Sequence, residues 1–389
     1  MLWTYPPVWQ TGIIERLEWQ TNVIEAQDGS EQRIALRQTP RRIFEFTFLV
    51  QDRQRAELEA KLWANGAKAW DVPIWTDKIL STSAILSGSM IVPVDTAYRD
   101  FVVGNKVLLQ DKYNTRLATI ATVYASYLTL TAAMPFDMEQ ETEVTPVRTG
   151  YLDQSQQVTR FTGDALYDVV RFQLDDISSH EAETAADMYR GYPVYEGATT
   201  GWDSDPVTSY QRKTDVVDFG HGGIYRDDLT GLPKLTSSHF WTISSRLAIA
   251  DFRAFLYARR GRLNAMWLPS FLPDLQLTSI TASAALQLNV LNTGYTDNYQ
   301  LAKNRRDIRI ELQDGTILYR RITTCAVIDD QTEQLTIGVA PGIDLVPDQI
   351  ERISFMTFSR LQADAIELAW QWGDLVNVNA NWVSTNDDI

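Results

Sequence analysis

The first clear strand of the chain reads Ile43-Phe44-Glu45-Phe46-Thr47-Phe48. Alternate side chains of a strand point to the same face, so the three phenylalanines share one side. Asp52 stands where a helix cap is expected, and leucines at positions 58 and 62 have the spacing of the buried side of a helix over residues 53–63. Gly66 suits the end of that helix. The pattern predicts a strand followed by one short helix.

The same pattern occurs a second time in the chain. A fixed offset of 193 relates residues 21–40 to residues 214–233, with identities at Thr21/Thr214, Val23/Val216, Gly29/Gly222, Arg33/Arg226, Leu36/Leu229 and Pro40/Pro233. A strand is expected at residues 238–243 and a helix near 248–259, with Phe252, Phe255 and Leu256 packed inward and Gly261 at its end. The matches keep their order, which favours a tandem duplication of units 1–187 and 188–389.

Short alternating strands follow each predicted helix, with turn signals such as Asp314-Gly315 between them. Each unit closes on another alternating segment, Tyr167–Leu174 or Val376–Val383, which most simply rejoins the first sheet. The expected fold is mainly β, with two tandem β-sandwich units that each carry one short helix and an inserted small β-barrel. The predicted domains are the first sandwich at 1–79 plus 149–187, its barrel at 80–148, the second sandwich at 188–275 plus 358–389, and its barrel at 276–357.

Charge and cysteine content exclude several function classes. The chain has 389 residues, 35 Lys and Arg against 50 Asp and Glu, and a formal net charge of -15. An acidic chain is repelled by phosphate, so we expect no specific nucleic-acid binding. Cys325 is the only cysteine of the sequence, which excludes an intrachain disulfide. The longest uncharged runs are too polar to span a bilayer, so no membrane insertion is expected. We expect the chain to be made in a cytoplasm.

Residues suited to catalysis or metal binding do not group in the sequence. The histidines, His180, His221 and His239, are scattered without neighbouring cysteines or spaced carboxylates. Gly220-His221-Gly222-Gly223 lacks the lysine and the following helix of a phosphate loop, so it is interpreted as a hairpin turn. No enzyme activity, no catalytic residue, no cofactor and no metal site is expected.

Two segments of the second unit carry a resemblance to a known family. They are Thr214-Asp215-Val216-Val217 and Phe255-Leu256-Tyr257-Ala258-Arg259-Arg260-Gly261-Arg262-Leu263, followed by the aromatic Trp267. They resemble the strand and helix end of distal tail proteins of long-tailed bacteriophages and gene transfer agents. The first unit looks like a diverged copy, with Asn65-Gly66-Ala67-Lys68 in place of the Arg-Arg-Gly-Arg run.

The resemblance implies a structural role in a virion. Such proteins form a homo-oligomeric ring between the tail tube protein and the hub of the tail tip or baseplate, leave a lumen for DNA, and offer a periphery for tail fibres. A tape measure protein is a further implied partner. Two sandwiches per chain would let three chains fill six quasi-equivalent positions, so a trimer with pseudo-sixfold symmetry is favoured over a hexamer.

Arginine clusters are the candidate subunit-contact residues: Arg259, Arg260 and Arg262 after the second helix, and Arg41 and Arg42 before the first strand. Arginine at a ring contact can fix register by bidentate hydrogen bonds to acidic neighbours. The alternative is a solvated face. Two other functions stay open: a threefold tail hub or adaptor protein, and a carbohydrate-binding β-sandwich whose aromatic residues would stack on sugars.

Overall fold

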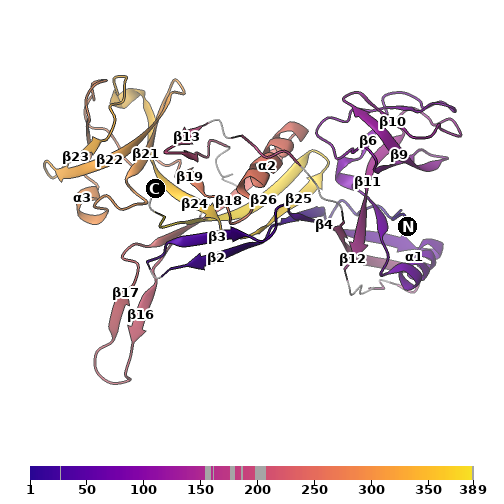
Figure 1. The fold of residues 1–389 in the computed structure, drawn as a ribbon, viewed down its shortest axis with the longest axis horizontal. Helices are drawn as coiled ribbons and strands as arrows, with labels where there is room; N and C mark the ends of the chain where they lie inside the picture. The colour runs from indigo at the N-terminus through magenta and orange to yellow at the C-terminus, as the bar shows by residue number, and fades with distance from the viewer. Residues whose placement is uncertain are drawn as a thin grey trace.

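The computed structural model of the chain describes residues 1–26, 28–153, 159–160, 162–175, 180–184, 187–197 and 207–387. Antiparallel strands dominate it, which confirms the mainly β fold class (Figure 1). Residues 176–179, 185–186 and 198–206, on both sides of the predicted boundary between the two units, lie outside the described residues. Among the described residues, no helix is long and apolar enough to cross a membrane.

The first sheet is built around β4 (Arg41–Gln51), which contains the phenylalanine strand. Its order is β1 (Ile13–Glu18), β4, β12 (Ala165–Leu174), β11 (Glu143–Leu152) and β5 (Trp70–Pro73), all antiparallel. Phe44, Phe46 and Phe48 are buried, as the alternation predicts. The closing strand β12 pairs with β4 along most of its length, so the expectation that it rejoins the first sheet is confirmed.

The second sheet repeats this arrangement. β18 (Lys234–Ser244) pairs with β26 (Leu375–Ser384), β26 pairs with β24 (Ile350–Leu361), and β24 pairs with β19 (Met266–Pro269). Strand β15 (Thr208–Gln211) lies beside β18, and β25 (Ala365–Trp372) lies beside β26. The strand register of β4 with β12 corresponds to that of β18 with β26. Ile43 is opposite Gln173 at the end of the first pairing, and Thr236, 193 positions after Ile43, is opposite Val383 at the end of the second.

The two predicted helices are confirmed as α1 (Asp52–Asn65) and α2 (Arg246–Arg259). The predicted cap of the first is wrong: Gln51 is the N-cap, without a side-chain bond, and Asp52 begins the helix with a φ of 47°. In α2 the Ser245 hydroxyl accepts a hydrogen bond from the Ala248 amide. Its C-cap is Arg260, which is left-handed, and Gly261 follows it.

Each inserted segment has a hydrophobic core of its own. The first contains β6 (Ile79–Leu80), β7 (Ile91–Pro93), β8 (Lys106–Gln110), β9 (Thr115–Tyr124) and β10 (Tyr127–Leu130). The second contains β20 (Gln287–Leu291), α3 (Tyr295–Asn298), β21 (Asp307–Leu312), β22 (Ile317–Val327) and β23 (Thr332–Ile337). Short 3-10 turns occur at Trp75–Asp77 and Pro347–Gln349. The two segments lie at opposite ends of the long axis (Figure 1).

Hairpins extend from both sheets at equivalent places. The first is β2 (Thr21–Glu25) with β3 (Glu31–Ala35), and the second is β16 (Thr214–Val217) with β17 (Tyr225–Asp228). Figure 1 shows β2–β3 along the body of the molecule and β16–β17 projecting from it. A further small hairpin pairs β13 (Met188–Tyr189) with β14 (Tyr192–Pro193).

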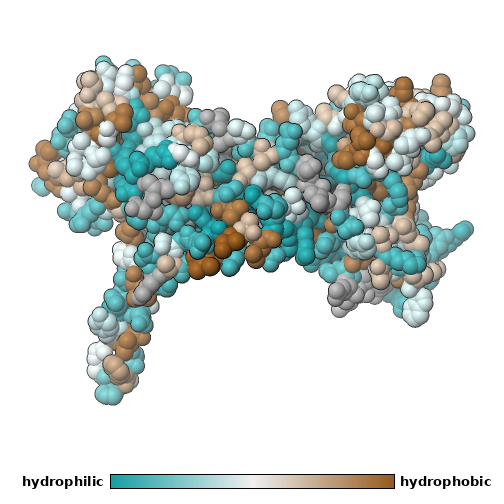
Figure 2. All heavy atoms as spheres, viewed as in Figure 1, coloured by the Kyte–Doolittle hydropathy of each residue, from teal (hydrophilic) through white to brown (hydrophobic). Residues whose placement is uncertain are grey.

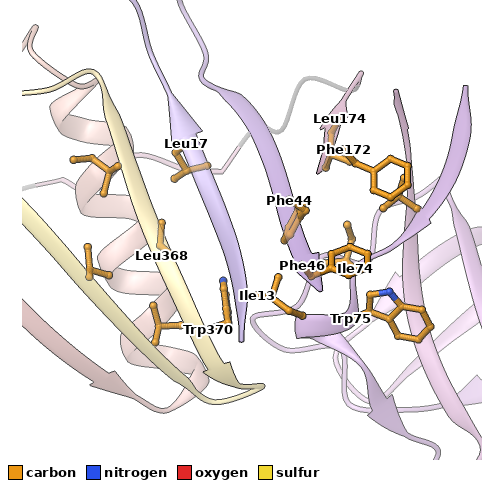
Figure 3. Close-up of a cluster of buried hydrophobic side chains, with 14 of the residues drawn as sticks. Ile13, Leu17, Phe44, Phe46, Ile74, Trp75, Phe172, Leu174, Leu368 and Trp370 are labelled. Atoms are coloured by element: carbon orange, nitrogen blue, oxygen red, sulfur yellow. The ribbon is translucent and has the colours of Figure 1, made fainter. Parts of the chain in front are cut away.

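One hydrophobic core runs through both sandwich units. Strand β1 pairs with β4 on one side and with β25 of the other unit on its second side. Figure 3 shows Ile13 and Leu17 of β1 between the aromatic residues of the first sheet and Leu368 and Trp370 of β25. The two sandwich units therefore share one hydrophobic core. The predicted division into units describes the repeat in the sequence and does not imply that each sandwich has a core of its own.

We expect Leu17→Ala to destabilise both units together. The Leu17 side chain is fully buried between the units, and such a truncation costs about 2–5 kcal/mol. Urea unfolding followed by tryptophan fluorescence would measure the loss. The matched control is Leu36→Ala, because Leu36 is exposed. A loss confined to one of two separate transitions would contradict the shared core.

Candidate subunit-contact site

Three of the five predicted arginines, Arg42, Arg260 and Arg262, lie where the two units meet within one chain. Arg42 is buried, Arg260 and Arg262 are half-buried, and Arg41 is exposed at the start of β4. Arg259 is buried on another side of α2. Each of the five has a different environment.

Arg42 belongs to a buried ionic network. Its Nε donates to Glu15 Oε1 at 2.6 Å, and it also pairs with Asp100, which in turn pairs with Arg148. Glu15 Oε2 accepts from Arg253 of α2 and, at 2.9 Å, from the indole nitrogen of Trp370. Both units and the first inserted segment thus contribute to one group of charges.

The arginines keep these carboxylates ionised. Burial disfavours the charged form of Glu15, but the charges of Arg253 and Arg42 and their hydrogen bonds lower its pKa to about 2. Burial likewise opposes ionisation of Asp100, and Arg42 and Arg148 hold the pKa of that carboxyl well below its usual range. Removing either partner would leave a buried charge uncompensated.

The network continues into the N-terminus of α2. The Asp100 amide donates to Asp77 Oδ2 at 2.8 Å, and Arg246 donates to Asp77 Oδ1 at 2.6 Å. Arg246 also donates to Asp374 Oδ1 at 2.9 Å. The helix of the second unit is therefore tied to the first unit at Arg246 as well as at Arg253.

Arg262 and Arg260 connect the end of α2 to the first hairpin. Arg262 donates to Asp364 and, at 2.7 Å, to the carbonyl of Thr21, and the Thr21 amide donates to Asp364 Oδ2 at 2.8 Å. Arg260 donates to Gln38. Gly261 allows this approach, because a Cβ atom there would lie 2.6 Å from Asp364 Oδ1. Beside them, Trp19 meets Tyr257 edge to face at 5.6 Å.

Arg259 faces away from this junction. It lines a cavity of about 360 Å³ with Glu183, Tyr195, Trp241 and residues of α2, and its guanidinium lies 5.6 Å from the Phe255 ring centre. Burial lowers its pKa, and the charge of Glu183 opposes that shift. Among the described residues it makes no hydrogen bond through Nε or Nη1.

Acidic residues of the hairpin β2–β3 form further bonds that the sequence pattern did not predict. Glu31 accepts from Arg360 at 2.6 Å and from Lys234 at 2.8 Å, and Lys234 also pairs with Glu25 at 3.1 Å. Arg33 pairs with Asp387 at 2.7 Å. The repeat in the sequence could have indicated this hairpin, because Thr21, Val23 and Arg33 are identical to the equivalent residues in the strands of the second hairpin.

These contacts hold the two units of one chain together. Whether the same arginines also bond between chains stays a prediction. In the described part of the chain, no cluster of three His, Cys, Asp or Glu side chains is suited to a metal ion. His180 and His239 are largely buried, and burial is the main cause that lowers the pKa of each to about 4. The arrangement is one of packing and ionic contact.

We expect acid to weaken the junction through Glu15. Its folded pKa is lowered from 4.5 to about 2, so the stability it contributes is fully present above pH 4.5 and is lost as the pH falls toward 2. Glu15→Gln should cost about 3–5 kcal/mol at pH 7, because Arg42 and Arg253 stay buried. It should also flatten the loss of stability between pH 4.5 and 2.

Urea unfolding at pH 7, 4 and 3 measures both effects. Glu367→Gln is the control, because Glu367 pairs with Arg16 at the surface. An equal pH dependence in both variants would contradict the role of Glu15.

No protein-family model matches the sequence, and no curated protein matches it. The likeness to distal tail proteins therefore depends on the residues of this chain alone, chiefly those of 214–217 and 255–263. A function for the chain has to be inferred from those residues together with the contacts described above.

Proposed function

We propose that this protein is a structural ring component of a phage tail tip or baseplate, without catalytic activity. It connects the tail tube to the hub, leaves a lumen for DNA, and presents a peripheral surface to other tail-tip proteins. The family resemblance at residues 214–217 and 255–263 suggests this role, and the duplicated architecture supports it.

The observation that carries the proposal is the side-by-side joining of two similar units. Each has a strand, a helix and a second strand in the same order: β4, α1, β5 and then β18, α2, β19. They are joined by one face of the first unit against one face of the second, through β1 and β25. Such a head-to-tail contact closes into a ring when its rotation repeats a whole number of times.

Three chains would supply six such units. In this proposal the ring is a trimer with pseudo-sixfold symmetry, and it matches a sixfold tube on one side and a threefold hub on the other. The partners are the tube protein, the hub, the tape measure protein and tail fibres on the periphery. The net charge of -15 suits a lumen that DNA passes without sticking. The place of action is the virion.

The inserted segments are the natural candidates for the periphery. Each has its own hydrophobic core and lies at an end of the long axis (Figure 1). Changes in their loops would leave the shared core of the two sandwich units intact. In this proposal they are the attachment surface for other tail-tip proteins.

The mass and symmetry of the purified protein test the proposal. We expect native mass spectrometry to give three times the chain mass of 44.2 kDa, and electron micrographs to show a ring with six similar lobes under threefold averaging. Added tube protein should bind one face of it. Six copies in one complex would contradict the trimer, and a monomer at about 100 μM would contradict the ring.

A further inference from the structure

The two helices are equivalent in sequence position but not in surroundings. Both have 14 residues, and Tyr257 of α2 occupies the position of Trp63 in α1. Tyr257 is 8% exposed and Trp63 is 93% exposed. Leu58 is the buried residue of α1, whereas α2 buries residues on several faces. Helix α2 is covered on a side where α1 is open.

Strand β1 and the start of β2 provide the cover on α2. Glu15 accepts from Arg253, Trp19 packs against Tyr257, and the Thr21 carbonyl accepts from Arg262. The first unit thus contributes one strand and one hairpin to the contact, and the second unit contributes helix α2 together with strand β25, which pairs with β1.

The second unit contains the same strand and hairpin, and no helix of the described part of the chain packs against them. β15 occupies the place of β1 beside β18, and its Tyr210, which corresponds to Leu17, is 65% exposed. Arg212 corresponds to Trp19 and is exposed. It donates to Asp228 and to the Gly231 carbonyl, which fixes its guanidinium plane. The strand with its hairpin, and the helix, therefore each occur a second time, open to solvent. No described strand of the first unit corresponds to β25.

The hairpins show the same relation. Glu25 and Glu31 of β2–β3 bind Lys234 and Arg360 of the second unit. The strand registers place Asp218 and Ile224 of the second hairpin at the positions of the two glutamates. They also place Arg41 and Tyr151 of the first unit at the positions of the two basic residues.

These four positions are complementary. The side chain of Arg41 makes no hydrogen bond or ion pair with the described residues, and Asp218 is exposed. Together they would replace the pair of Lys234 with Glu25. Tyr151 and Ile224 are both exposed apolar residues, and they would replace the pair of Arg360 with Glu31. Both residues of the Arg360–Glu31 pair are thus charged in the internal contact, and both equivalents in the open faces are apolar.

The free halves lie far apart on the molecule. Figure 1 shows α1 at one end of the long axis and the hairpin β16–β17 toward the other, so one chain cannot join them itself. Apolar atoms occur along the projecting hairpin in Figure 2. Its exposed apolar residues are Val216, Phe219, Ile224 and Tyr225. Exposed apolar surface rimmed by charge is typical of a protein contact.

We propose that a second copy of this chain binds there, with its α1 and the Arg41 end of its β4 against β15 and the hairpin β16–β17. The contact repeats between chains the part of the internal contact that α2 makes with β1 and the hairpin β2–β3. Trp63 of one copy stacks on the guanidinium of Arg212 of the next, and Arg41 pairs with Asp218. This inference rests on the proposed ring and assigns its subunit contact.

Crosslinking of two single-cysteine chains tests the contact directly. In a Cys325→Ser background, one preparation carries Trp63→Cys and the other Arg212→Cys, and a short bismaleimide is added. We expect a covalent dimer as the main product of the mixture and none from either preparation alone, because the two faces differ. Crosslinked dimer from one preparation alone, or none from the mixture, would overturn the assignment.

Charge exchange and truncation test the energetics. Trp63→Ala should weaken association more than about tenfold. Arg41→Glu and Asp218→Lys should each prevent assembly, and the two changes in one chain should restore it. The control is Tyr113→Ala, an exposed aromatic residue of the first inserted segment, which should assemble normally. Unchanged melting temperatures of the monomers would show that folding is intact.

The outcomes separate the two proposals. Rings that form without the crosslink and despite Trp63→Ala would overturn this contact and leave the ring proposal standing. A parent chain that stays monomeric, together with no crosslinked dimer from the mixture of the two cysteine variants, would overturn both proposals.

Discussion

The carboxylate of Glu15 is the group on which the arrangement of the chain depends most. It is fully buried, and a buried charge is tolerated only with close partners of the opposite sign. Arg42 comes from the neighbouring strand, whereas Arg253 and Trp370 come from the other unit. Separating the units would leave three charges in an apolar surrounding. The ionic network thus selects one relative placement of the sheets, and the apolar packing around Leu17 contributes the stabilising free energy.

The repeat explains why this placement is unequal for the two units. When a chain has two similar units joined by one internal contact, the strand-and-hairpin face and the helix face each occur twice. One copy of each face is buried in the contact and the other is exposed. The differences between equivalent residues, Tyr257 and Trp63 or Glu31 and Ile224, separate the internal contact from the open one. The internal contact depends on buried ion pairs, whereas the proposed contact between chains depends on stacking and apolar area. A face of one kind would therefore not bind the partner of the other kind.

Local pattern predicted the elements well and their assembly poorly. Alternation at Phe44, Phe46 and Phe48 and the spacing of Leu58 and Leu62 gave β4 and α1, since both periodicities are written in neighbouring residues. The same alternation puts Arg42 on the phenylalanine face, which indicates burial within the chain rather than a place at a subunit contact. The pairing of β1 with β25 could not be predicted, because partners 347 to 357 positions apart leave no periodic pattern in the sequence. Asp52 failed as a cap because Gln51 ends the strand and begins the helix directly.

Strands β11 and β24 each belong to two bodies at once. β11 pairs with β8 in the first inserted segment and with β5 and β12 in the sheet, and β24 does the same with β21, β19 and β26. A force that pulls an inserted segment along β11 or β24 would act on many backbone hydrogen bonds of that strand at the same time. It would not break them one after another. The attachment is mechanically stiff for that reason, and a pull or twist at the outer end would reach the central sheets with little lost in a hinge.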